Sequence, residues 1–141
     1  MSDAAIRQAL QAYQSAVDAK GVDAFVAIYA DDVQVFELWT QWEHDLASWR
    51  DMAVGWFRFL GEERAVVEAH DVRTQVVGDL ALLTASLTYR AIDADGEEQR
   101  SLDNRLTWVL RRHGERWLVT HEHTSVPIAF EGGTGIFKRP G

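Results

Sequence analysis

The pattern of apolar and polar residues changes once along the chain, close to Gly61. Before this residue, apolar side chains recur every three or four positions, which is the period of one face of an α-helix. From residue 64 onward they alternate with polar side chains, which is typical of β-strands. The pattern therefore predicts helices in the first part of the chain and a run of strands in the second.

Three helices are predicted before Gly61. The first carries four apolar residues at helical spacing, namely Ile6, Leu10, Tyr13 and Val17. A short second helix begins at Asp23, carries Tyr29 and ends at the acidic residues 31–32. The third helix is capped by Asp45 and ends at Gly61, because glycine takes up the backbone conformation that stops a helix.

Five strands are predicted, at residues 33–37, 64–77, 80–91, 100–112 and 116–126. Helices followed by such a meander predict an α+β domain, with three N-terminal helices packed on a curved, mainly antiparallel β-sheet. The helices leave a cone-shaped space over the sheet, which is a natural ligand site. Residues 1–130 are predicted to form this single domain. The glycine-rich tail, 131–141, is expected to be loose or to lie over a neighbour.

The composition narrows the range of partners. The 141 residues carry a net charge of −8 and no cluster of basic residues, so neither nucleic acid nor an anionic membrane is an expected partner. The chain has no cysteine, which excludes disulfides and a thiol nucleophile. No secretory signal is visible, and no apolar run approaches the roughly 20 residues that span a bilayer. We therefore expect a cytoplasmic protein.

The last two predicted strands carry most of the polar residues that are candidates for chemistry. Side chains alternate between the two faces of a strand. On the fourth strand, Asn104 and Trp108 share the apolar face with leucines, and Arg105 lies on the other face. On the last strand, alternation separates Glu122 from its two neighbours His121 and His123. The two faces of this strand therefore have different roles.

Two stretches resemble the NTF2-like superfamily, in particular its ketosteroid isomerases and SnoaL-like polyketide cyclases. Residues 11–37 combine a tyrosine on the first helix, a small-Gly-x-Asp link, an aromatic-Ala-Asp-Asp segment and a carboxylate that closes the first strand. Residues 105–127, with Thr-Trp-Val-Leu, a turn and Trp-x-Val-x-His-Glu-His, look like the end of SnoaL-like and calmodulin-kinase association-type members. The resemblance implies the NTF2-like cone.

The resemblance also implies acid–base chemistry. In ketosteroid isomerases the tyrosine that matches Tyr13 donates a hydrogen bond to the developing oxyanion, and the carboxylate that matches Glu37 moves the proton beside the carbonyl. Asn104 is the nearest polar residue to the position of the second oxyanion acid, where this chain has Leu106. The alternative interpretation is that Tyr13 is a core residue and Glu37 lies on the surface.

Alignment of the last strand with isomerase-like relatives turns three residues inward, namely Thr120, Glu122 and Thr124. Glu122 is therefore a second candidate acid or base. Trp39 lies in the loop that borders the cavity mouth in relatives, and Trp56 and Trp108 come from the third helix and the sheet. Such a lining favours a flat, apolar or aromatic ligand. The alternative is a tryptophan-rich core.

The same alignment leaves an outward set of side chains on the last strand, His121, His123 and Ser125, beside Arg105. In this superfamily the outer face of the sheet commonly forms a dimer, so we expect a homodimer interface here. The alternative is a catalytic role, because a one-residue slip of the strand exchanges its faces. Two histidines without a third ligand do not define a metal site, and we expect neither metal nor cofactor.

These residues together predict a small-molecule pocket protein. If it is an enzyme, it is a cofactor-free isomerase, cyclase or dehydratase that acts on an apolar molecule with a carbonyl group. The alternative is a non-catalytic domain for ligand binding or oligomerisation (association).

Overall fold

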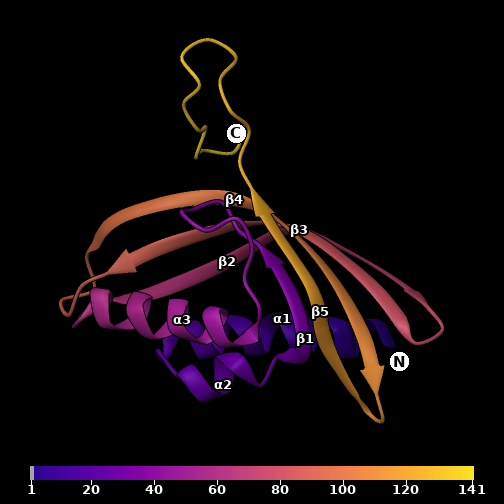
Figure 1. Cartoon of the computed structure of the whole chain (residues 1–141). Helices are drawn as coiled ribbons and strands as arrows, with labels where there is room; N and C mark the ends of the chain where they lie inside the picture. Colours follow the sequence, from indigo (N-terminus) through magenta and orange to yellow (C-terminus); the bar gives the residue numbers. More distant parts are fainter. Residues whose placement is uncertain (1) are drawn as a thin grey trace.

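The computed structural model describes residues 2–141 (Figure 1). Its helices and strands are α1 (Ser2–Asp18), α2 (Val22–Val26), β1 (Tyr29–Phe36), α3 (Leu46–Leu60), β2 (Arg64–Val77), β3 (Leu80–Ile92), β4 (Glu98–His113) and β5 (Arg116–Ser125). The strands form one sheet in the order β1-β5-β4-β3-β2. All neighbours are antiparallel except β1 and β5, which run parallel. The predicted mainly antiparallel α+β fold is confirmed.

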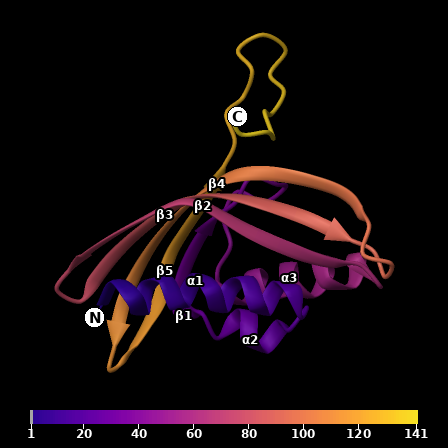
Figure 2. The ribbon, with the colours of Figure 1, turned by 180° about the vertical axis from the view of Figure 1, so that it is seen from behind.

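The helices lie on one side of the sheet, and the long strands curve over them (Figures 1 and 2). The predicted apolar face of α1 is buried, and it packs against inward side chains of the sheet such as Leu83, Leu87 and Trp108. Each aliphatic side chain buried in this way contributes about 1.5–3 kcal/mol to folding. Asp45 caps α3 as predicted, since its Oδ1 accepts a hydrogen bond from the Ser48 N–H at 2.9 Å. None of the helices within residues 2–141 is long and apolar enough to cross a bilayer.

The second helix is shorter than predicted, because the chain has already become a strand at Tyr29. Tyr29 pairs with Val119 of β5, and the Val119 N–H donates to the carbonyl of Ile28 at 3.0 Å. This pairing between distant segments overrides the helical spacing of the local sequence. Asp31 and Asp32, predicted to end the helix, are instead exposed residues of β1.

The last strand contains a bulge that changes its alternation. Val109 of β4 pairs with His121, whereas the next residue, Leu110, pairs with Val119, so Thr120 is the extra residue. As a result Val119 and Glu122 are both buried on the helix side of the sheet, although they are three positions apart. Alternation alone would have put them on opposite faces.

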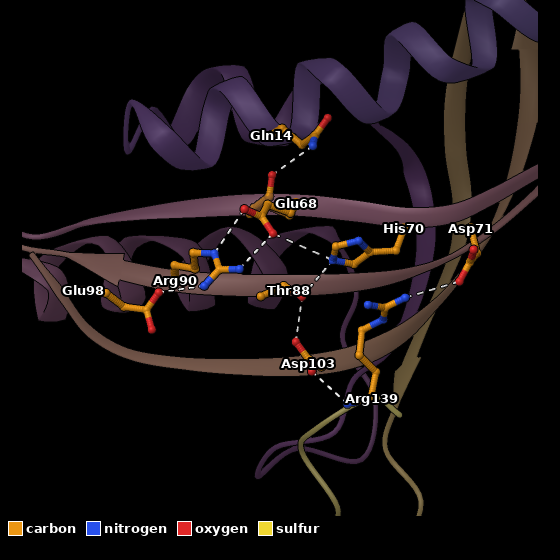
Figure 3. A network of polar contacts seen from close by, with 10 residues as sticks. Gln14, Glu68, His70, Asp71, Thr88, Arg90, Glu98, Asp103 and Arg139 are labelled. Atoms are coloured by element: carbon orange, nitrogen blue, oxygen red, sulfur yellow. Dashed lines mark hydrogen bonds and ion pairs between the residues drawn. The ribbon is translucent and has the colours of Figure 1, made fainter. Parts of the chain in front are cut away.

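The C-terminal segment forms a hairpin that projects from the body of the molecule (Figures 1 and 2) and then returns to the sheet. The Asp103 N–H donates to the carbonyl of Phe137 at 2.8 Å, and the Arg139 N–H donates to Asp103 Oδ2, also at 2.8 Å. The other carboxylate oxygen of Asp103 accepts from the Thr88 hydroxyl at 2.7 Å, and His70 contacts the same hydroxyl (Figure 3). Asp103 thus attaches the tail to β4 through both its backbone and its buried carboxylate.

The charge of Asp103 is stabilised where it lies. Burial alone would raise the pKa of this carboxyl, but the hydrogen bonds from Arg139 and Thr88 and the nearby positive charges of Lys138 and Arg139 lower it below its usual value. Because the pKa is lower in the folded state, the stabilisation from the ionised Asp103 is fully present above the usual carboxyl pKa. It is lost as the pH falls from there through the lowered pKa of the folded state.

Replacing Asp103 with asparagine is expected to release the tail. The amide has one acceptor oxygen, so one of the two donors, Thr88 or the Arg139 N–H, meets an NH₂ group instead. We expect a loss of roughly 1–3 kcal/mol in urea unfolding and faster hydrogen exchange at residues 137–139. Asp71→Asn is the matched control, since Asp71 makes an exposed ion pair with Arg139 at 3.5 Å. Equal exchange rates in the two variants would contradict this role of Asp103.

Candidate functional site

A cavity of about 850 Å³ lies between α3 and the curved sheet, and residues 37–41 and 44 form part of its wall. Its apolar lining combines aliphatic side chains such as Leu38 with four large aromatic ones, Trp39, Trp49, Trp56 and Phe59. Its polar lining gathers Tyr13, Glu37, His44, Tyr89, Asn104 and Glu122, which come from five separate parts of the chain. A few polar groups in an aromatic cavity are the usual composition of a small-molecule site.

Glu122 is the most deeply buried carboxyl in this wall, with 2% of its surface exposed. Tyr29 and Trp108 both donate hydrogen bonds to its Oε1, from Oη at 2.6 Å and from Nε1 at 2.8 Å. Burial raises its pKa to about 7, although the two hydrogen bonds act in the opposite direction. Because both bonds end on Oε1, Oε2 is the oxygen left to exchange a proton with a ligand. A carboxyl with this pKa can act as an acid or as a base near neutral pH.

Tyr13 and Tyr89 form a pair of hydroxyl groups in the same cavity, with 2.7 Å between their oxygens. Burial raises the pKa of both groups, so both stay protonated at neutral pH. Only one of the two protons is used within the pair. The other can be donated to a ligand oxygen.

Glu37 follows the end of β1, and its side chain is directed to the interior, where 7% of it is exposed. Its Oε1 lies 3.7 Å from Nε2 of His44, whose Nδ1 lies 3.0 Å from the Ser48 hydroxyl. His44 is held there by a two-way backbone pairing with Val35. Burial raises the pKa of Glu37, and the neighbouring His44 partly offsets the rise.

Three residues of the cavity wall each have a buried polar atom with no hydrogen-bond partner among residues 2–141. The atoms are Nε2 of His44, Nε1 of Trp49 and Oδ1 of Asn104. Buried polar groups in folded proteins are nearly always hydrogen-bonded, because leaving one unpaired costs about 1–3 kcal/mol. These atoms are therefore suited to contact a polar group of a ligand.

The residues predicted for the pocket do not all lie in its wall. Trp39, Trp56, Asn104 and Thr124 line the cavity together with the predicted catalytic residues Tyr13, Glu37 and Glu122. Trp108 is fully buried in the core and acts on the site through its hydrogen bond to Glu122. Thr120 is the bulge residue of β5 and is not part of the wall.

The cavity also contains polar residues that the sequence did not single out. Tyr89 shares the inward face of β3 with Leu83 and Leu87, so strand alternation was a usable signal. For His44 no local signal exists, because its position depends on the backbone pairing with Val35. Tyr29, which donates a hydrogen bond to Glu122, lies at the start of β1 and not in the predicted second helix.

The predicted outward residues lie outside this cavity wall. Arg105 donates from Nε to the Ser125 hydroxyl at 3.1 Å. The ring of Phe36 stands edge-on to both His121 and His123, with ring centroids 5.0 and 5.6 Å apart. Among the described residues, no three His, Asp or Glu side chains are grouped as metal ligands.

Comparison with known families identifies the chain. A family model described as a SnoaL-like domain matches residues 6–129. The chain belongs to the SnoaL-like family. The predicted NTF2-like fold is thereby confirmed. The SnoaL-like family is one of small-molecule-binding or isomerase-like proteins.

Solved structures share the fold of this SnoaL-like chain. An NTF2-like protein of unknown function from Pseudomonas putida KT2440 is 25% identical, with a TM-score of 0.84 over 100% of this chain and 99% of that one. An NTF2-like protein with a cystatin-like fold from Novosphingobium aromaticivorans is 15% identical, with a TM-score of 0.76 over 92% of this chain and 82% of that one. Curated protein sequences give no match.

Proposed function

We propose that this SnoaL-like protein binds an apolar molecule with a carbonyl group in the cavity and moves a proton on it without a cofactor. One observation carries the proposal: the Glu122 carboxyl, with a pKa of about 7, lines the same cavity as a protonated tyrosine pair. A base beside a hydroxyl donor is the arrangement that enolisation requires.

The proposed step begins with removal of a proton from the carbon next to the carbonyl. Glu122 or Glu37 takes the proton, and the electron pair of the broken C–H bond moves onto the carbonyl oxygen. Tyr13 or Tyr89 donates a hydrogen bond to this oxygen, and Asn104 supplies a further polar contact. The enolate can then react in three ways. If the proton returns to another carbon, the ligand is isomerised, and if the enolate attacks a second carbonyl, a ring is closed. If a β-hydroxyl group leaves as water, the ligand is dehydrated.

Proton exchange tests this step without knowledge of the natural substrate. The flat ketone 2-tetralone in D₂O is expected to exchange its α-protons faster with the protein than without it, as followed by NMR. Glu122→Gln should slow the protein-dependent exchange by about 10²–10⁴-fold. Glu115→Gln, in the exposed turn after β4, is the control that should change nothing. Binding of the ketone without faster exchange would favour the alternative of a non-catalytic ligand-binding domain.

We further propose that the outer face of β4 and β5 pairs two copies of the chain. The exposed Arg105 and His123 and the ring of Phe36 support this proposal, because arginine and aromatic side chains are enriched at such contacts. Thr107 pairs with His123 near the middle of this face. Thr107→Arg brings like charges together across a two-fold axis, so a dimer should become a monomer in light scattering. A wild-type chain that is already monomeric would contradict the proposal.

A further inference from the structure

Carboxyl groups outnumber basic groups in the cavity lining. The acidic lining residues are Glu37, Asp51 and Glu122, and the arginine or lysine side chains that line it within residues 2–141 are Arg90 and Arg100. Neither guanidinium is free. Arg90 binds both carboxylate oxygens of Glu68, each at 3.1 Å, and Arg100 binds both of Glu63 at 2.9 and 3.1 Å.

Arg90 also contacts a second carboxylate, that of Glu98, at 2.7 Å. A carboxylate or phosphate group on a ligand would have to compete with these two-point ion pairs, which are among the stronger hydrogen-bonded pairs in proteins. It would also enter beside two buried carboxyl groups, in a chain whose net charge is −8. An anionic ligand is therefore unfavourable here, because the field of the whole protein repels it.

The aromatic part of the wall suits a positive charge. The rings of Trp56 and Tyr89 lie 5.9 Å apart at an angle of 61°, so two π-systems meet at one corner of the cavity. At another part of the wall the guanidinium of Arg100 lies 5.4 Å from the centre of the Phe59 ring, which shows a cation held against an aromatic face. Cations are attracted to such faces, and several rings together form the cages that bind ammonium groups.

We propose that the ligand of this cavity is an organic cation, an ammonium group carried on a flat apolar body. The ammonium lies between the carboxyl groups of Glu37 and Glu122 and the rings of Trp56 and Tyr89, and the apolar body fills the remaining aromatic space. This inference rests on the proposed function, because it names the class of molecule for the same site. A carbonyl compound that also bears an amine fits both the proposed proton transfer and the preference for a cation.

Three ligands of the same shape and different charge test the proposal. They are 2-naphthylmethylamine, 2-naphthylmethanol and 2-naphthoate, titrated at pH 7.5 and low salt and followed by tryptophan fluorescence and calorimetry. We expect the amine to bind at least about tenfold more tightly than the alcohol and the naphthoate to bind most weakly. Glu37→Gln and Glu122→Gln should each weaken binding of the amine by a larger factor than binding of the alcohol, and so reduce the ratio of amine to alcohol affinity.

Matched variants separate this effect from the net charge and from surface binding. Glu115→Gln removes the same charge at an exposed turn and should keep the ratio of the wild-type chain. Gly55→Phe, which places a ring in the cavity, should abolish binding of the amine. Amine binding that survives Gly55→Phe would overturn the inference, and so would a ratio that neither glutamine variant changes.

The outcomes also separate this inference from the proposed function. If the alcohol or the naphthoate binds as tightly as the amine and Gly55→Phe abolishes that binding, the cavity is a ligand site and the charge preference alone is wrong. If none of the three binds, the cavity is not a site for flat apolar molecules, and the proposed function falls with the inference.

Discussion

We expect the wild-type chain to lose stability as the pH rises from about 5 to 7. The Glu122→Gln variant is expected not to show this loss. The pKa of Glu122 is raised from 4.5 to about 7 in the folded protein, so the folded state binds more protons than the unfolded state in this interval. Stability therefore falls as the pH rises through the interval and is level above it. Each pKa unit corresponds to about 1.4 kcal/mol, so the total is about 3 kcal/mol.

The measurement is urea unfolding at several pH values between 4.5 and 8.5, with the variant and the wild-type chain treated alike. The amide of glutamine keeps an oxygen that can accept from Tyr29 and Trp108, so the variant is expected to fold. Glu115→Gln again serves as the control, because an exposed carboxyl should not change the curve. If the curves of Glu122→Gln and the wild-type chain are parallel, Glu122 is not the group that titrates near pH 7.

Gly55→Phe is expected to block the cavity without unfolding the protein. Gly55 lies in α3 and lines the cavity, and a Cβ atom built on it meets no other atom within 4 Å. Because Gly55 lines the cavity, we expect the added ring to reach into the space that a ligand would occupy. Replacing a glycine in the middle of a helix with alanine stabilises it by about 0.5–1 kcal/mol, and phenylalanine, a weaker helix former, gives part of this gain. We therefore expect at least a tenfold weaker affinity for 2-tetralone, about 1.4 kcal/mol, with an equal or higher Tm.

Gly55→Ala separates the two effects. It gives the gain in helix stability but leaves the cavity nearly empty, so its affinity for 2-tetralone should stay close to that of the wild-type chain. Thermal unfolding and a fluorescence titration of all three chains complete the comparison. Unchanged affinity in a well-folded Gly55→Phe would show that flat ketones bind elsewhere.

Much of this fold could be predicted from local patterns. The bounds of β2 agree with the alternation of its side chains, and the cap of α3 agrees with the position of Asp45. The start of β1 could not be found in this way. Its pairing partner, β5, lies near the other end of the chain, and only contact with that strand makes Tyr29 extended rather than helical.

The residues of the candidate site also divide into those with a signal in the local sequence and those without one. Tyr13 and Glu37 were found through motifs that lie within short stretches, and both line the cavity. Alternation pointed to Glu122 only in part, because the bulge at Thr120 breaks the period just before it. His44 was missed, since the backbone pairing that buries it joins two segments separated by a loop. Periodicity carries no information about such pairings.

The parallel pairing of β1 with β5 has a consequence for the order of folding. β1 lies at the edge of the sheet, and its neighbour there is the last strand of the chain. Pairs with a large sequence separation form slowly, because a long loop must close before any contact is gained. During synthesis, Glu37 therefore emerges long before the strand that carries Glu122. We therefore expect the α1 helix and the β2–β4 hairpins to assemble first, and the two carboxyl groups to reach their common cavity late.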